Sequence, residues 1–166
     1  MIVSTYQAVS GAGAAGLAEL EQQIADYAAG NPLNIKAFPY QIAANLIPQI
    51  GGDTGNGYTS EEMKMQNEGR KIMHLPELKV SCTCVRVPVI RSHSISVSCH
   101  FDVPVTVEQV RTAIAKAPGC RLVDDLANKR YPMPLETSNQ DIVFVGRIRP
   151  DLTDDCGICL WCCGDQ

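Results

Sequence analysis

The chain has 166 residues, of which 45% are hydrophobic and 19% are charged, a composition typical of one globular domain and not of a disordered or fibrous chain. Its formal net charge of −4 and the lack of any Lys/Arg run argue against nucleic-acid binding. No apolar stretch approaches the roughly 18 residues that a membrane span needs, and Met1–Ser4 has no leader pattern, so we expect a cytoplasmic protein.

The first third of the sequence predicts a strand, a helix and a long loop. Apolar and β-branched residues over 2–9 predict the strand. Apolar residues recur at helical spacing over 14–29, and Gly30 would end that helix. Residues 31–57 are rich in Pro, Gly and Asn and are expected to be mostly loop.

The run Gly11-Ala12-Gly13-Ala14-Ala15-Gly16 matches G-x-G-x-x-G between the predicted strand and helix. This context is the one that a dinucleotide-binding fingerprint requires, so a Rossmann domain is one interpretation. Against it, no strand ends in an acidic residue about 20 positions later, where the chain reads Gly30-Asn31-Pro32-Leu33, and no further βαβ repeats follow.

The remaining elements mix helices and strands. Thr59-x-x-Glu62 and Thr106-x-x-Gln109 are capping-box patterns, which predict helices that reach about His74 and Gly119. Residues 120–140 look irregular because of their prolines. Strand-like runs complete the chain at Lys79–Val89, Ile95–Phe101, Asp141–Ile148 and Cys156–Cys163. This succession predicts an α+β fold, a mixed sheet with helices packed on one face.

Eight cysteines require an explanation, since Cys156-x-x-Cys159-x-x-Cys162-Cys163 superficially matches an iron–sulfur ligand run. Strand alternation would place Cys156 and Cys162 on one face and Cys159 and Cys163 on the other, so the four would not converge on a metal. Cysteine packs as a small hydrophobe. We therefore favour a structural role and expect no metal site, while a cysteine-based metal-binding protein is the alternative.

The segment Val85–His93 is the most informative part of the sequence. It combines a fixed cation, Arg86, with a titratable imidazole, His93, in an otherwise apolar stretch, which suits an anion clamp beside an acid/base group. A structural ion pair and a core histidine are the alternatives. The two residues are seven apart, so a regular strand would point them to opposite faces. A shared pocket therefore requires a break, for which Pro88 is the obvious position.

Four ordered segments resemble the aspartate-semialdehyde dehydrogenase family: Ser4–Gly13, Ile47–Ile50, Tyr58–Lys64 and Ser81–Ser94. The resemblance implies a larger enzyme with an amino-terminal dinucleotide-binding domain and a cysteine nucleophile, neither of which this sequence contains. We therefore expect residues 1–166 to be a single substrate-binding and dimerisation domain, truncated at both ends and inactive alone. Its fold would be that of the carboxy-terminal domain shared with glyceraldehyde-3-phosphate dehydrogenase.

The resemblance also implies a reaction and a set of site residues. The reaction is the NADPH-dependent reductive dephosphorylation of L-4-aspartyl phosphate to L-aspartate 4-semialdehyde, in the biosynthesis of lysine, threonine, methionine and isoleucine. Gln7 would orient the substrate around the acyl-enzyme, and Arg86 would bind its α-carboxylate. Glu61 would pair with its ammonium and Lys64 with the phosphate, while His93 would be the acid/base. From spacing alone, Glu61 and Lys64 would be an exposed pair on a solvated helix.

Three further residues would contact the NADP cofactor in such an enzyme, namely Ser10, Gly11 and Gln166. The likeness also implies a homodimer. A non-catalytic module that binds small acidic metabolites or associates with itself remains an alternative, as a descendant of the same domain.

Overall fold

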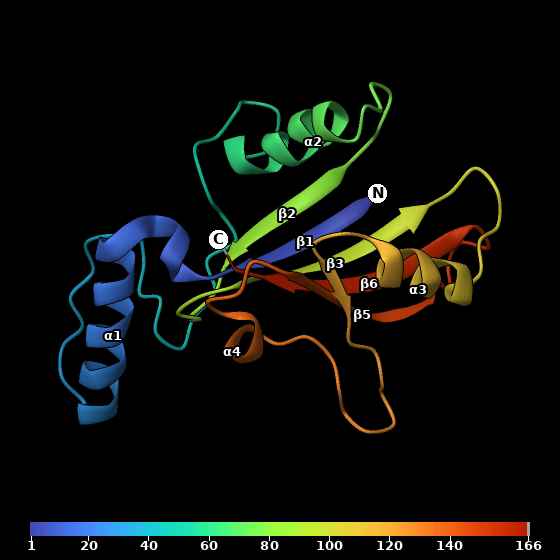
Figure 1. Cartoon of the computed structure of the whole chain (residues 1–166). Helices are drawn as coiled ribbons and strands as arrows, with labels where there is room; N and C mark the ends of the chain where they lie inside the picture. Colours follow the sequence, from blue (N-terminus) through green and yellow to red (C-terminus); the bar gives the residue numbers. More distant parts are fainter. Residues whose placement is uncertain (166) are drawn as a thin grey trace.

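A mixed six-stranded sheet forms the centre of the structure, a computed structural model in which residues 1–165 are described (Figure 1). The strands lie in the order β2-β1-β3-β6-β5-β4. Their bounds are β1 Ile2–Gln7, β2 Ser81–Arg86, β3 His93–His100, β4 Cys120–Leu122, β5 Val143–Pro150 and β6 Gly157–Gly164. The pairs β1–β2 and β4–β5 are parallel, and the other neighbours are antiparallel. The predicted α+β fold with a mixed sheet is confirmed.

Two helices cover one face of this sheet, which we call the inner face. Helix α2 (Ser60–Ile72) packs over β1 and β2 through a core around Val3, Cys82 and Cys84. Helix α3 (Val107–Lys116) packs over β5 and β6 through Val145, Ile148 and Ile158. Both predicted capping boxes are present, so threonine and Glu or Gln side chains satisfy backbone N–H groups in the first turn of each helix.

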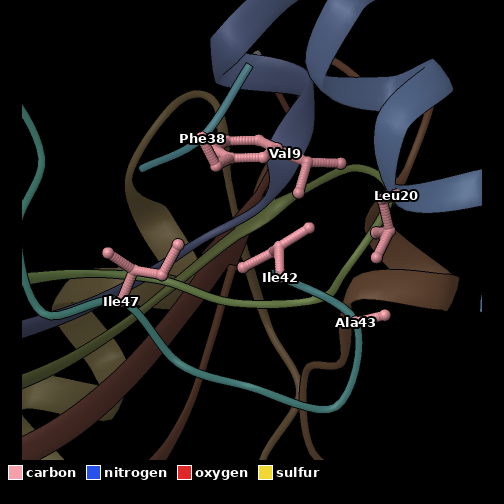
Figure 2. Packing of buried hydrophobic residues seen from close by; sticks show 6 residues of the cluster. All are labelled: Val9, Leu20, Phe38, Ile42, Ala43 and Ile47. Atoms are coloured by element: carbon pink, nitrogen blue, oxygen red, sulfur yellow. The ribbon is translucent and has the colours of Figure 1, made fainter. Parts of the chain in front are cut away.

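Helix α1 (Gly13–Ala29) lies beyond one end of the sheet, after a short 3-10 turn, η1 (Val9–Ala12) (Figure 1). Gly30 ends α1 in the left-handed conformation, as its sequence position predicted. Loop residues fold back onto the helix and form a core that Figure 2 shows in detail, made of Val9, Leu20, Phe38, Ile42, Ala43 and Ile47. The segment expected to be mostly loop is therefore packed against the helix.

A buried glutamine fastens that segment. The Oε1 atom of Gln23 accepts the backbone N–H groups of Ile42 and Ala43 at 2.9 and 3.1 Å, and its Nε2 donates to the carbonyl of Asn34. These bonds satisfy backbone groups that have no strand partner. The same segment reaches the sheet where Ile47 forms an isolated antiparallel bridge with Arg86, so α1 indirectly supports the end of β2.

Residues 120–140 contain more structure than the sequence predicted. They include β4 and a one-turn helix, α4 (Pro134–Thr137), which packs against β6 on the outer face, where Thr137 contacts Cys163. Tyr6 and Trp161 also meet on this outer face, with ring centroids 5.4 Å apart. Within the described part of the chain, no helix has the length and apolar character to cross a membrane.

Candidate active site

Strands β1 and β2 end, and strand β3 begins, side by side at one end of the sheet; we call this end of the strands the site edge. The parallel strands β1 and β2 end side by side, and Gln7 is the register partner of Arg86. Strand β3 runs antiparallel on the other side of β1 and begins at His93, one residue before the partner of Tyr6. Because paired residues on adjacent strands point to the same face, Gln7, Arg86 and His93 share the inner face.

The connection from β2 to β3 explains how Arg86 and His93 can share a face. Residues 87–92 leave the sheet at the position of Pro88, so the two residues belong to different strands and their odd spacing no longer separates them. The connection follows the chain after β1 through bonds from Val9 N–H to Val89 O and from Ser10 N–H to Ile90 O, of 2.9 and 3.2 Å.

Arg86 is a buried cation at the centre of this edge, with 7% of its surface exposed. Its Nη1 donates to the carbonyl of Ala8 at 2.5 Å, and its backbone is held by Ile47. Among the described residues, no carboxylate lies within ion-pair distance of its guanidinium. Burial lowers the pKa of Arg86, an effect that nearby Glu61 opposes. A buried arginine usually has an anionic partner, so this site is suited to receive one.

Helix α2 brings Glu61 and Lys64 to the same edge. Gln7 Nε2 lies 3.4 Å from Glu61 Oε1, and Lys64 Nζ lies 3.0 Å from Glu61 Oε2. Burial raises the pKa of Glu61, but hydrogen bonds from Lys64 and Gln7 outweigh it, so the net pKa is lowered and the carboxylate is charged. Gln7 therefore links the helix pair to the strand ends. Lys64 remains exposed.

His93 is held in one orientation by the chain after β1. The backbone N–H of Ala8 donates to its Nδ1 at 3.1 Å, which leaves Nε2 to carry the proton of the neutral ring. Burial, together with the positive charge of Arg86, lowers the pKa of His93 to about 4. The imidazole is therefore neutral at pH 7, and Nε2–H is its only donor.

Two hollows border this cluster. A cavity of about 180 Å³ reaches Arg86 and is otherwise lined mainly by loop residues that include Phe38, Ile47 and Gln49. An open hollow of about 500 Å³ is lined by Ser10 and Gly11, with Arg91 beside them. The backbone N–H groups of Ser10 and Gly11 are bonded to Ile90 O and Ala8 O, so a cofactor there would have to contact other atoms. Gln166 lies outside the described residues.

The cysteines of the sheet lie on both of its faces. No group of three or more His, Cys, Asp or Glu residues suited to a metal occurs within residues 1–165, and all eight thiols are free. In β6 the register places Cys162 on the inner face and Cys159 and Cys163 on the outer face, as alternation predicted. Burial raises the pKa of Cys162 to about 11, which keeps this inner-face cysteine a thiol at neutral pH.

Sequence reasoning missed two buried polar residues behind the cluster. Thr5 donates from Oγ1 to Gln7 Oε1 at 2.9 Å. Glu62 accepts the N–H of Thr59 at 2.8 Å and that of Cys84 at 3.0 Å, which ties the first turn of α2 to the edge strand β2. The Thr59-x-x-Glu62 pattern predicted only the bond within the helix. The bond to the strand had no signal in the sequence.

The chain resembles known proteins over its whole length. It matches the family described as semialdehyde dehydrogenase, dimerisation domain, over residues 1–166. It is 46% identical to an aspartate-semialdehyde dehydrogenase of Synechocystis sp. over 100% of the chain and 49% of that protein. A Campylobacter jejuni protein of the same name is 48% identical over 99% of the chain and 48% of its own length.

A solved structure gives the same result. Aspartate semialdehyde dehydrogenase II of Vibrio cholerae, in complex with ASA, superposes with a TM-score of 0.95 at 41% identity. The match covers 99% of this chain and 48% of that one. The chain thus spans about half the length of the relatives it matches.

Proposed function

Because the chain belongs to the semialdehyde dehydrogenase family through its dimerisation domain, we propose that it supplies the substrate site of an aspartate-semialdehyde dehydrogenase. The reaction is the reductive dephosphorylation of L-4-aspartyl phosphate to L-aspartate 4-semialdehyde, an early step of lysine, threonine, methionine and isoleucine biosynthesis. The observation that carries this proposal is the buried Arg86, which has no carboxylate partner among the described residues.

The substrate's charges fit the charges at the strand ends. The guanidinium of Arg86 would bind the α-carboxylate through its remaining donors, as a charge-assisted pair. The charged Glu61 would receive the α-ammonium, and the exposed Lys64 would bind phosphate as a point charge. Arg86, Glu61 and Lys64 are close enough to bind one small substrate. Gln7 contacts Glu61 and is paired with Arg86 across the two strands.

His93 would act on the oxygen of the reacting carbon. Its neutral ring presents Nε2–H as a donor, which would stabilise the oxyanion that forms when a thiolate attacks the carbonyl. To act as a full acid/base, the ring must first give up the Ala8 N–H, since only then can Nδ1 take a proton. Gln7 would hold the acyl group in place by a hydrogen bond from its amide.

The thiolate and most of the cofactor site would come from outside residues 1–166. We propose none of the eight cysteines as the nucleophile, since Cys82, Cys84 and Cys163 are buried and burial raises the pKa of Cys162. We propose NADP as the cofactor, on the ground of family membership, with Ser10 and Gly11 bordering it and Gln166 as a further contact. The bound cofactor supplies or accepts the hydride.

We further propose that the protein is a homodimer. The family description names a dimerisation domain, and the outer face of β1 exposes Ile2 (67%) and Tyr6 (36%). A second copy would cover this apolar surface on the face opposite the substrate site. Sedimentation analysis would show a dimer, and Tyr6→Glu would shift it to monomer. A monomeric wild-type chain would contradict this part.

A chimera tests the catalytic proposal. Residues 1–166 would replace the matching half of the Campylobacter jejuni relative, and the assay would follow NADPH formation from L-aspartate 4-semialdehyde, phosphate and NADP⁺. We expect turnover by the chimera, loss of turnover in Gln7→Ala, and none from the 166-residue chain alone. A folded chimera that neither binds the semialdehyde nor forms NADPH would refute the proposal.

A further inference from the structure

Gln7 is held from behind by a buried threonine on the same strand. Thr5 and Gln7 are two residues apart in β1, so their side chains point to the same face, and both are nearly fully buried, with 3% and 7% exposed. Thr5 Oγ1 donates to Gln7 Oε1 at 2.9 Å. Nothing in the proposed chemistry uses Thr5 directly, so this hydrogen bond requires its own explanation.

This bond acts together with the Glu61 contact to set which end of the Gln7 amide faces the site, because a carboxylate can only accept and therefore faces Nε2. A glutamine amide can present either an acceptor oxygen or a donor NH₂ group, and its rotation exchanges the two. The carbonyl Oε1 can only accept, so the single hydroxyl proton of Thr5 goes to Gln7. Oε1 of Gln7 is therefore turned toward Thr5, and its Nε2 is turned toward Glu61.

A second contact favours the same orientation, and a bound substrate would compete with it. Gln7 Nε2 also donates to Glu61 Oε1, at the longer distance of 3.4 Å. In the proposed function, Glu61 turns to the substrate ammonium, which competes for the same carboxylate. Once Glu61 is engaged, the bond from Thr5 is the contact that still holds the amide.

We propose that Thr5 is a positioning residue, which locks the Gln7 amide with its NH₂ group toward the substrate. Gln7 then recognises an acceptor on the substrate, the acyl or aldehyde oxygen, and not a donor. This inference rests on the proposed function, because it assigns an orientation to a residue of that same site.

Three substitutions isolate the hydroxyl in the chimera. Thr5→Val keeps the shape and removes the donor, and Thr5→Ser restores the donor on a smaller side chain. Thr83→Val is the matched control, since Thr83 lies on the neighbouring strand and is exposed. We expect Thr5→Val to lower kcat roughly tenfold, the effect of one hydrogen bond, with the KM for phosphate unchanged. The kcat of Thr5→Ser should stay within about twofold of the wild-type value, and the kcat of Thr83→Val should equal the wild-type value.

A second measurement on the 166-residue chain needs no turnover. The side-chain amide of Gln7 should give one sharp pair of proton resonances in nitrogen-resolved NMR spectra, which broaden or double in Thr5→Val and recover in Thr5→Ser. Equal kcat and unchanged amide resonances in Thr5→Val would overturn the inference, as would a Thr5→Ser variant as impaired as Thr5→Val. If Gln7→Ala itself has full activity, it is the assignment of Gln7 in the proposed function that fails.

Discussion

Replacing Arg86 by lysine should separate the shape of the cation from its charge. One N–H of Arg86 is bonded to Ala8, and the others form the planar fork that matches a carboxylate. Lysine keeps a charge but offers no fork, and the burial that already lowers the pKa of Arg86 would disfavour a charged lysine more strongly, because its pKa starts lower. We expect a loss of ~2–4 kcal/mol in transition-state binding, or about 30- to 900-fold in kcat/KM.

The assay is the steady-state kinetics of the chimera with L-aspartate 4-semialdehyde, at saturating NADP⁺ and phosphate. The control is Arg121→Lys. Arg121 is an exposed residue of β4 that lies over the ring of Phe144 on β5, and β4 is at the opposite side of the sheet from β1 and β2. Unfolding temperatures of both variants show whether the fold is intact. A folded Arg86→Lys variant with near-normal kcat/KM would mean that Arg86 is structural and that the carboxylate binds elsewhere.

Three further predictions concern the same edge of the sheet. His93 has a folded pKa of about 4 against about 6.5 in the unfolded chain, so the unfolded state takes up a proton first as the pH falls. The free energy of unfolding should therefore drop by up to about 3 kcal/mol between pH 6.5 and 4, with no such loss above pH 6.5. Thermal melts of His93→Asn should show a weaker pH dependence than those of the wild type. The same pH dependence in both proteins would refute the prediction. Lys64→Ala should raise the KM for phosphate and leave that for the semialdehyde nearly unchanged, and an equal rise in both would contradict its role. Glu62→Gln should destabilise the chain by ~1–3 kcal/mol in urea unfolding, because each oxygen of the Glu62 carboxylate accepts one N–H group, from Thr59 and from Cys84, and an amide would place an NH₂ donor against one of them. Thr59→Ala, which keeps the bond to the strand, should cost less.

The sequence predicted those parts of the fold that local rules determine. Both capping boxes, the Gly30 helix end and the strand alternation around Cys162 depend only on neighbouring residues. Strand β4 and helix α4 were missed because they are very short. The packed segment 31–57 was missed because its order depends on Gln23, whose acceptor oxygen meets Ile42 and Ala43 only after the chain folds back.

The candidate site shows the same division. Motif resemblance indicated Gln7, Glu61, Lys64, Arg86 and His93, but periodicity could not place Arg86 and His93 on one face. Their shared face comes from β1, which lies between β2 and β3 in the sheet, and strand order is set by contacts between distant segments. The neutral state of His93 also had no sequence signal, because it depends on the Ala8 N–H and on burial beside Arg86.

The central claim is that one small acidic substrate binds where β1 and β2 end and β3 begins. A direct test is an NMR titration of the 166-residue chain with L-aspartate 4-semialdehyde, which monitors backbone amides, the Arg86 guanidinium, the Gln7 amide and the His93 ring. We predict saturable shifts that centre on these three side chains and disappear in Arg86→Ala. Shifts confined to other parts of the sheet, or binding that persists in Arg86→Ala, would contradict the account.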